Sequence, residues 1–174
     1  MAHETATLFF ALLAAALTLV VTAVGVSLVF DRDDRLGFLG QLRPVASEAA
    51  AAVAVTCTLG SLYLSEVAGF VPCRLCWVQR AFMYPAAAVL IAAVVTRRRS
   101  LAYAGGALAA IGLPVSVFHR IEQSAGEIGG VCDAGNSCAE RWVNHFGFVT
   151  IPTMAAVGFV GILVFVLLSR SAST

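Results

Sequence analysis

Cysteine is the residue type in this sequence with the most chemistry to offer, because a thiol can form a disulfide, attack one, or bind a metal ion. The 174-residue chain has five cysteines. Four of them form two close pairs, Cys73 with Cys76 in a C-x-x-C sequence and Cys132 with Cys138 in a C-x5-C sequence. Cys57 stands alone, and we interpret it as a packing residue within a helix. The two pairs are therefore the first candidates for a functional site.

The residues around the C-x-x-C pair indicate which sulfur is reactive. Pro72 precedes the pair and a helix-forming apolar run follows it. Cys76 is therefore expected at or near a helix N-terminus, where the partial positive charge favours a thiolate. Arg80 lies four residues after Cys76, so the two side chains share one helix face. A guanidinium beside that sulfur would stabilise the thiolate further and polarise a bound electron acceptor.

The composition indicates the surroundings of these residues. Hydrophobic residues make up 60% of the chain and charged residues 12%, and the mean hydropathy is +0.90. Ordinary soluble domains have about 45–50% apolar and about 25% charged residues. The net charge is only +1. These values exclude a disordered chain, a nucleic-acid binder and an ordinary soluble enzyme, and they favour a protein whose solvent is the lipid bilayer.

Five apolar runs have the length of about 17–25 residues that a membrane-spanning helix needs. The sequence therefore predicts an all-α membrane protein with a four-helix bundle and one extra N-terminal transmembrane helix. The extra helix and a polar loop occupy residues 1–46, the four-helix core with both cysteine pairs occupies 47–170, and 171–174 form a short tail. The first run has the alternative of a signal peptide, but it lacks a basic n-region and is longer than a usual h-region. The predicted spans are 5–30, 47–70, 77–96, 100–118 and 150–169.

The distribution of arginine predicts the orientation of these spans. Three arginines lie in the 31–45 loop, three in the 97–99 loop, and Arg170 follows the last span. These segments share one side, which the positive-inside rule assigns to the cytoplasm. The N-terminus and both cysteine pairs are therefore expected outside and the C-terminus inside, in a multi-pass protein of the cell membrane. The outer side is an oxidising compartment, where disulfides persist.

Three kinds of site are compatible with two cysteine pairs in that compartment. Two structural disulfides would only hold loops together. A zinc site is common for C-x-x-C plus a second pair, although a C-x5-C half-site is unusual for zinc. The third is a relay, in which thiol–disulfide exchange passes two electrons from one pair to the other. We favour the relay, with no bound metal, because both pairs lie on one side of the predicted bundle.

The sequence Pro72-Cys-Arg-Leu-Cys-Trp-Val-Gln-Arg80, followed by Met83-Tyr84-Pro85, resembles the motif of the bacterial DsbB family of membrane thiol–quinone oxidoreductases. The resemblance covers about residues 47–169 and is closest to the BdbC branch. The vitamin K epoxide reductase family differs, since it places its C-x-x-C after the loop pair. The extra first span departs from the four-helix core of the family. Further shared traits are Ser65-Glu66, Phe118-His119, the close loop pair, and Gly147-Phe-Val-Thr-Ile-Pro152.

The resemblance implies an activity and a role for each cysteine. Such a protein reoxidises a soluble, extracytoplasmic thioredoxin-fold (DsbA-like) partner and passes the electrons to membrane quinone, either ubiquinone or menaquinone. Cys76 would face the quinone, Cys73 would exchange with Cys138, and Cys132 would form the mixed disulfide with the partner. Arg80 matches the quinone-site arginine of the family. The same relay run as a disulfide reductase stays an alternative, because relative potentials set the direction.

Weaker signals concern residues at the outer ends of the spans. Glu66 is a candidate proton relay at the quinone site, and His119 is a candidate for passing protons or touching quinone. For each, the alternative is a polar residue at a helix end, and for Arg80 it is an interfacial anchor. Residues 140–148 have apolar side chains at helix-like spacing. They predict a helix lying flat on the membrane that steers the loop pair toward Cys73, or otherwise an irregular loop.

Overall fold

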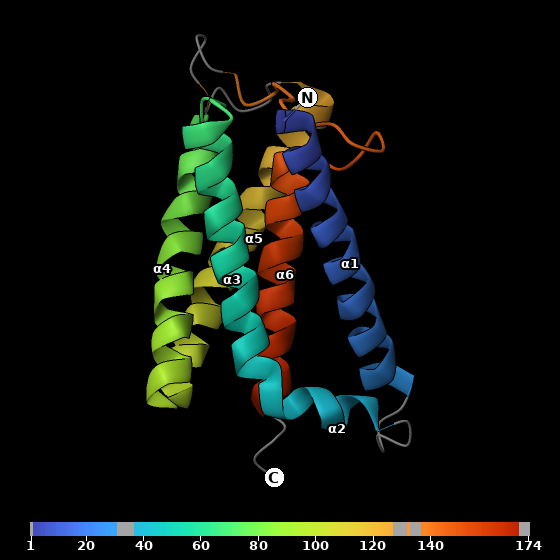
Figure 1. Ribbon diagram of the computed structural model, residues 1–174, viewed down its shortest axis with the longest axis vertical. Coiled ribbons are helices and arrows are strands. Elements are labelled where there is room, and N and C mark those ends of the chain that lie inside the picture. Colours follow the sequence, from blue (N-terminus) through green and yellow to red (C-terminus); the bar gives the residue numbers. More distant parts are fainter. Residues whose placement is uncertain (1, 31–36, 127–131, 133–136, 171–174) are drawn as a thin grey trace.

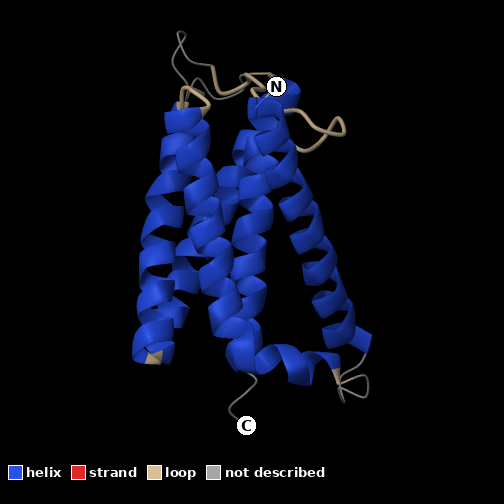
Figure 2. Ribbon diagram, viewed as in Figure 1, coloured by secondary structure: helices blue, strands red, loops and turns tan. Residues whose placement is uncertain are grey.

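The structure is a computed structural model, and it describes residues 2–30, 37–126, 132 and 137–170. Within these residues the chain folds into helices and connecting loops with no β-strand (Figure 2). Five helical segments are long and apolar enough to cross a membrane. The helices are α1 (Ala2–Phe30), α2 (Phe38–Leu42), η1 (Arg43–Val45), α3 (Ala46–Leu62), η2 (Tyr63–Val67), α4 (Arg74–Thr96), α5 (Arg99–Ala125) and α6 (Ile151–Arg170).

The predicted all-α membrane fold, a four-helix core with one additional helix, is confirmed. Helices α3, α4, α5 and α6 pack into one bundle, and α1 packs along α6. Figure 1 shows α1 close to α6 near the N-terminus and diverging from it toward α2, which runs from the side of the far end of α1 toward the start of α3. The short helices α2 and η1 lie within the segment predicted to be a polar loop, and they connect α1 to α3.

Close approach at small residues holds the core helices together. A Cβ atom at Gly112 of α5 would overlap the ring of Phe159 of α6, and one at Gly105 would lie 2.6 Å from Cγ of Leu90 in α4. Phe159 and Leu90 are themselves fully buried. Helices in lipid gain little from the hydrophobic effect between them, so van der Waals packing at such residues contributes much of their association.

Helix α5 extends beyond its predicted end at residue 118, as far as Ala125. The prediction that a polar loop begins at His119 is therefore wrong. The reason is that the polar side chains of the last two turns face the protein, since His119, Glu122 and Gln123 are buried. Ile121 between them is exposed. Polar residues on the inner face of a helix look like a loop in a hydropathy pattern.

The helix predicted over residues 140–148 is not formed, and the alternative of an irregular loop is correct. The segment is a tight turn, closed by backbone hydrogen bonds of 3.0 and 2.9 Å between His145 and Val149. Phe146 and Gly147 at its tip have φ angles of 55° and 78°. These left-handed conformations are incompatible with a continuing right-handed helix. The helix-like spacing of the apolar side chains was therefore not a guide to the backbone.

Candidate active site

The C-x-x-C pair begins helix α4, three residues earlier than the sequence predicted. Cys73 is the N-cap residue, with extended backbone angles (φ −72°, ψ 173°). Its sulfur accepts a hydrogen bond from the backbone N–H of Cys76 at 3.3 Å. The first N–H groups of a helix lack intrahelical acceptors, and here a thiol sulfur takes the place of the usual oxygen. Both sulfurs thus lie at the positive end of the α4 dipole.

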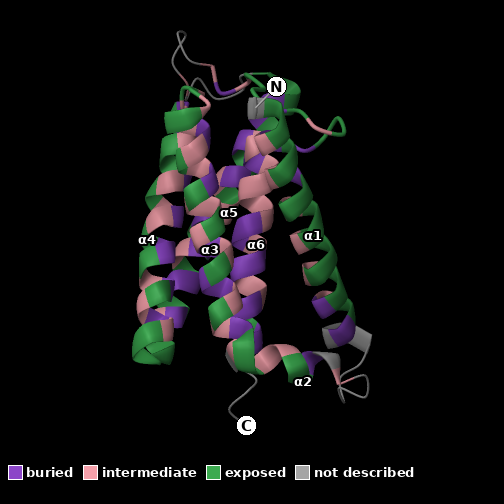
Figure 3. Ribbon diagram, viewed as in Figure 1, coloured by how far each residue is buried: buried purple, intermediate pink, exposed green. Residues whose placement is uncertain are grey.

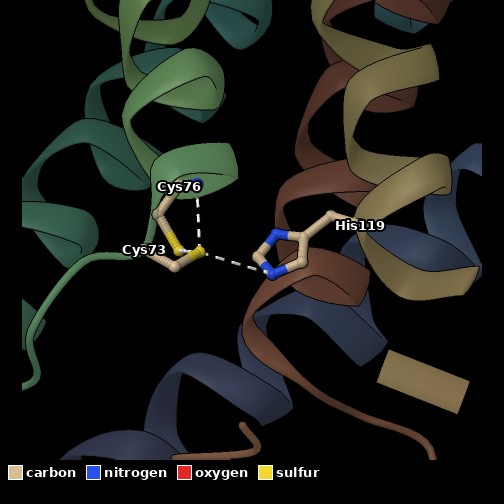
Figure 4. A group of neighbouring side chains, drawn as sticks. All are labelled: Cys73, Cys76 and His119. Atoms are coloured by element: carbon tan, nitrogen blue, oxygen red, sulfur yellow. Dashed lines mark hydrogen bonds between the residues drawn. The ribbon is translucent and has the colours of Figure 1, made fainter. Parts of the chain in front are cut away.

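A third side chain, from α5, joins these two sulfurs (Figure 4). The sulfurs of Cys73 and Cys76 lie 2.8 Å apart, both as free cysteines. Nε2 of His119 lies 3.6 Å from the Cys73 sulfur. Cys73 and His119 are buried, with 5% and 2% of their surfaces exposed. The structure therefore surrounds Cys73, rather than Cys76, with groups that stabilise a thiolate.

These contacts change the acidity of Cys73. The hydrogen bond with the Cys76 thiol is the largest effect and lowers the pKa of Cys73 below its ordinary value. Burial acts in the opposite direction, and the hydrogen bond and charge of His119 lower the pKa further. Because the pKa is lowered, the Cys73 thiolate persists at a pH where an ordinary cysteine is protonated. A thiolate is the nucleophile in thiol–disulfide exchange.

The second cysteine pair lies against the first. Cys132 and Cys138 form a disulfide. Cys138 is 1% exposed and belongs to a buried cluster with Cys73 and Leu75. Cys132 is partly buried and packs against the same cluster. The loop disulfide therefore packs against the C-x-x-C pair, and Cys138 is the more deeply buried of its two cysteines.

An apolar cavity of about 350 Å³ lies on the other side of Cys76. Its volume is within the range of small-molecule sites. Side chains from α1, α3, α4 and α6 line it, together with Trp142 of the loop. Few of the lining side chains are polar. The polar lining residues on α4 are Gln79, Arg80 and Tyr84.

Arg80 is held across the cavity by α3. Its Nε donates to Oγ of Ser61 at 3.0 Å, and its Nη2 donates to the Ser61 carbonyl at 3.1 Å. The Tyr84 hydroxyl lies 3.3 Å from Oγ of Ser61, and the guanidinium lies over the ring of Trp77. These partners offset the cost of placing a cation within a membrane helix. Arg80 and Cys76 line the same cavity from consecutive turns of α4.

The structure separates the two weaker candidates. His119 lines a small space beside Cys73, and Glu66 is exposed in η2, where it accepts a hydrogen bond from Ser65 at 3.0 Å. Among the described residues that line the large cavity, neither is present. His119 therefore lies beside the thiols of the C-x-x-C pair. Glu66 lies neither beside these thiols nor in the lining of the large cavity. A quinone contact by either residue stays a prediction.

Two lining residues had no part in the sequence-based site. Gln79 is buried and donates to Oγ of Ser116 on α5 at 2.9 Å. A polar residue inside an apolar run was the available signal for it. Cys57, interpreted as a packing residue, also lines the cavity and lies against Gly158. The cavity therefore contains more polar and thiol groups than the motif alone indicated.

The same thiols have the donor types that a metal ion uses. Ligand atoms of Cys73, Cys76 and His119 all lie within 4.8 Å of one another. The zinc arrangement considered from the sequence needs both cysteine pairs as thiolates. Because Cys132 and Cys138 are joined in a disulfide, their sulfurs do not offer that ligand set.

Comparison with known proteins finds relatives whose names refer to disulfide formation. A probable disulfide formation protein of Oceanobacillus iheyensis is 43% identical over 111 residues, which are 62% of this chain and 75% of the relative. Disulfide bond formation protein C of Bacillus subtilis (strain 168) is 38% identical over 120 residues, covering 68% of this chain and 87% of the relative. Probable disulfide formation protein C 1 of Bacillus anthracis is 43% identical over 109 residues, covering 62% and 78%.

No solved structure gives a significant match to the chain. The family described as "Disulfide bond formation protein DsbB" matches residues 45–169. The match includes both cysteine pairs and the four core helices, and it begins after α1 and α2. With its apolar helices, paired cysteines and this match over most of its length, the chain belongs to the DsbB family of disulfide bond formation proteins.

Proposed function

We propose that the protein is a membrane thiol:quinone oxidoreductase that reoxidises an extracytoplasmic thioredoxin-fold partner. The observation that supports this most is the position of Cys76. Its sulfur is 2.8 Å from Cys73 on one side, and its side chain lines the apolar cavity on the other. A residue so placed can connect a thiol-exchange centre with an apolar electron acceptor. The names of the relatives agree with a role in making disulfides.

The proposed relay balances in thiols and electrons. The reduced partner attacks Cys132, and its own dithiol becomes a disulfide as the Cys132–Cys138 bond breaks. Cys138 then attacks Cys73 of an oxidised C-x-x-C pair, so the loop disulfide reforms and the Cys73–Cys76 bond breaks. The resulting dithiol closes again by losing two electrons and two protons. The burial of Cys138 beside Cys73, with Cys132 less deeply buried, supports this order.

The cavity suits a quinone as the acceptor of those electrons. A quinone has an apolar ring and two carbonyl oxygens, and it becomes a quinol by taking two electrons and two protons. The apolar lining matches the ring, and Gln79, Arg80 and Tyr84 offer N–H and O–H donors for the oxygens. Arg80 keeps donors beyond the two that Ser61 uses. Its charge would favour negative charge developing on the acceptor.

The proposed orientation places both cysteine pairs outside the cell membrane. Ser124 is exposed near the end of α5 that carries His119, and Ser100 is exposed at the other end. In a cysteine-free variant, a cysteine at Ser124 should react with a membrane-impermeant maleimide in intact cells, because the oxidising side is open to the reagent. A cysteine at Ser100 should react only after permeabilisation. Labelling of Ser100→Cys alone in intact cells would reverse the orientation.

The relay makes a prediction for each cysteine. Cys73→Ser or Cys76→Ser should abolish reduction of a soluble quinone by a reduced DsbA-like donor, because the last dithiol cannot close. With an oxidised donor, Cys138→Ala should accumulate a mixed disulfide, because the Cys132 thiol opens the donor disulfide and Cys138, the thiol that would resolve the adduct, is missing. Non-reducing gels measure this adduct. An adduct that forms equally in Cys132→Ala would contradict the proposed order.

The contact of Cys73 with His119 predicts a pH dependence. In a Cys76→Ser background, which keeps a hydrogen-bond donor, Cys73 should be alkylated at a pH well below the ordinary thiol pKa of about 8.5. Because the pKa is lowered, the reaction should slow only as the pH falls through that lowered value. His119→Phe should move the profile to higher pH, since it removes a donor and a positive charge.

His145→Phe provides the matched control, because His145 contacts Thr7 of α1 instead of a thiol. Its alkylation profile should equal that of the parent variant. An unchanged profile in His119→Phe as well would mean that His119 does not act on Cys73.

Arg80 is expected to act through its charge and its fixed position. Arg80→Met should reduce quinone affinity or turnover about ten- to a hundredfold, as expected for losing a charge-assisted interaction of about 1.5–3 kcal/mol. Arg80→Lys should keep part of the activity, and Ser61→Ala should weaken quinone binding by releasing the guanidinium. Steady-state quinone kinetics measure all three. Wild-type kinetics in Arg80→Met would leave Arg80 as an interfacial anchor.

A further inference from the structure

Helix α1 contributes to the cavity although it lies outside the family match. The match begins at residue 45, and α1 ends at Phe30. Phe10, Leu13, Ala14 and Leu17 of α1 nevertheless line the cavity that contains Cys76. Their spacing of three, one and three residues places them on one face of the helix. The cavity therefore has a wall that the four core helices do not supply.

Glycines of the core receive this face of α1. A Cβ atom at Gly60 of α3 would lie 3.1 Å from Cε1 of Phe10, and one at Gly161 of α6 would lie 2.9 Å from Cδ2 of Leu17. The rings of Phe10 and Tyr63 also pack, with centroids 6.0 Å apart. Larger side chains at the two glycines would push α1 away from the bundle. The core surface is thus shaped to hold α1 against both edges of the cavity.

A polar contact fixes the outer end of α1. Nε2 of His145 lies 3.0 Å from Oγ1 of Thr7, which also donates to the Glu4 carbonyl at 3.0 Å. Thr7 is 5% exposed. His145 belongs to the tight turn that follows the loop disulfide and precedes α6. The end of α1 nearest the thiols is therefore attached to the loop that carries the second cysteine pair.

Most of the rest of α1 is exposed, although Val24 is fully buried in a cluster with Leu39, Ala46 and Leu168. In its most apolar 18-residue window 11% of residues are buried, against 28–44% in the other four spans. Figure 3 shows exposed residues along much of its length. A helix that buries so little adds little to the packing of the bundle. Its most specific contacts are those beside the cavity and at Thr7.

We propose that α1 is a specificity-determining wall of the quinone site. Its face from Phe10 to Leu17 closes the cavity between α3 and α6, separates it from lipid chains, and limits the size of the quinone ring that can reach Cys76. Without this face, that side of the cavity would be open to the bilayer. This inference rests on the proposed quinone reduction and adds the helix that selects the quinone.

Neighbouring alanines of α1 allow a matched test. Ala14 lines the cavity, whereas Ala15 is exposed and is absent from its lining. Ala14→Phe should raise KM for a soluble naphthoquinone by about tenfold or more, because the added ring occupies the cavity. The rise should be smaller for a soluble benzoquinone, whose ring system is smaller. Ala15→Phe should leave both KM values unchanged.

A separate readout tests whether the effect is confined to the quinone. Single-turnover reduction of the Cys132–Cys138 disulfide by a reduced DsbA-like donor should be the same in Ala14→Phe and wild type, because that exchange does not use the cavity. A merely structural role of α1 would instead alter this exchange and both quinones alike. If Ala14→Phe does not fold, two milder variants test the same point. Ala14→Leu adds a smaller side chain to the cavity wall, and Leu17→Ala removes side-chain volume from it. The ratio of the two KM values is measured in each.

The outcomes distinguish this inference from the proposed function. If wild type reduces neither quinone while its thiol exchange is intact, the proposed function fails. If wild type reduces both quinones and the folded variants at Ala14 and Leu17 keep the wild-type ratio of the two KM values, α1 does not select the quinone. A changed ratio in these variants, with Ala15→Phe unchanged, supports the inference.

Discussion

The structure depends on one constraint, which is that helices in a bilayer are held together by close packing and polar contacts more than by the hydrophobic effect. Contact of Phe159 with Gly112 fixes α6 against α5, and contact of Leu90 with Gly105 fixes α4 against α5. His119 lies about two turns beyond Gly112 on α5. The packing that sets the helix positions therefore also sets the distance from His119 to the Cys73 sulfur at the start of α4.

The long spans and the helical start at the C-x-x-C pair were predictable, because an apolar run in a bilayer has few backbone alternatives to a helix. The end of α5 was not predictable, because the polar inner face of its last turns, which carries His119, has the hydropathy of a loop. The hydrogen-bond partner of Arg80 could not be predicted from the sequence either. Ser61 lies on another helix, and only the packing of α3 against α4 brings the two together. The local hydropathy pattern thus predicted the helices. Which side chains pair between helices became visible only from the arrangement of the helices in space.

The two thiols of the C-x-x-C pair occupy different environments although only two residues separate them. Cys73 is the N-cap of α4 and has the Cys76 backbone N–H, the Cys76 thiol and His119 around its sulfur. Cys76 is within the first turn and faces an apolar cavity. In the proposed relay, negative charge is therefore favoured on the sulfur that exchanges with the loop disulfide, while the other sulfur faces the proposed uncharged acceptor. In the proposed relay, this difference in environment would give the chemically symmetric dithiol a direction, because each sulfur would have its own partner.

The chemistry and the selection of the acceptor come from different parts of the chain. Every thiol of the proposed relay, and the histidine beside Cys73, lies within the residues that match the family. Helix α1 supplies no reactive group to the described site, yet Phe10 and Leu17 fit against glycines of the core and close the cavity. A change on that face of α1 alters the shape of the cavity without touching a sulfur or Arg80. Under the proposed function, the preference for an acceptor could therefore vary independently of the thiol exchange. The hydrogen bond between Thr7 and His145 additionally joins α1 to the loop that follows Cys138.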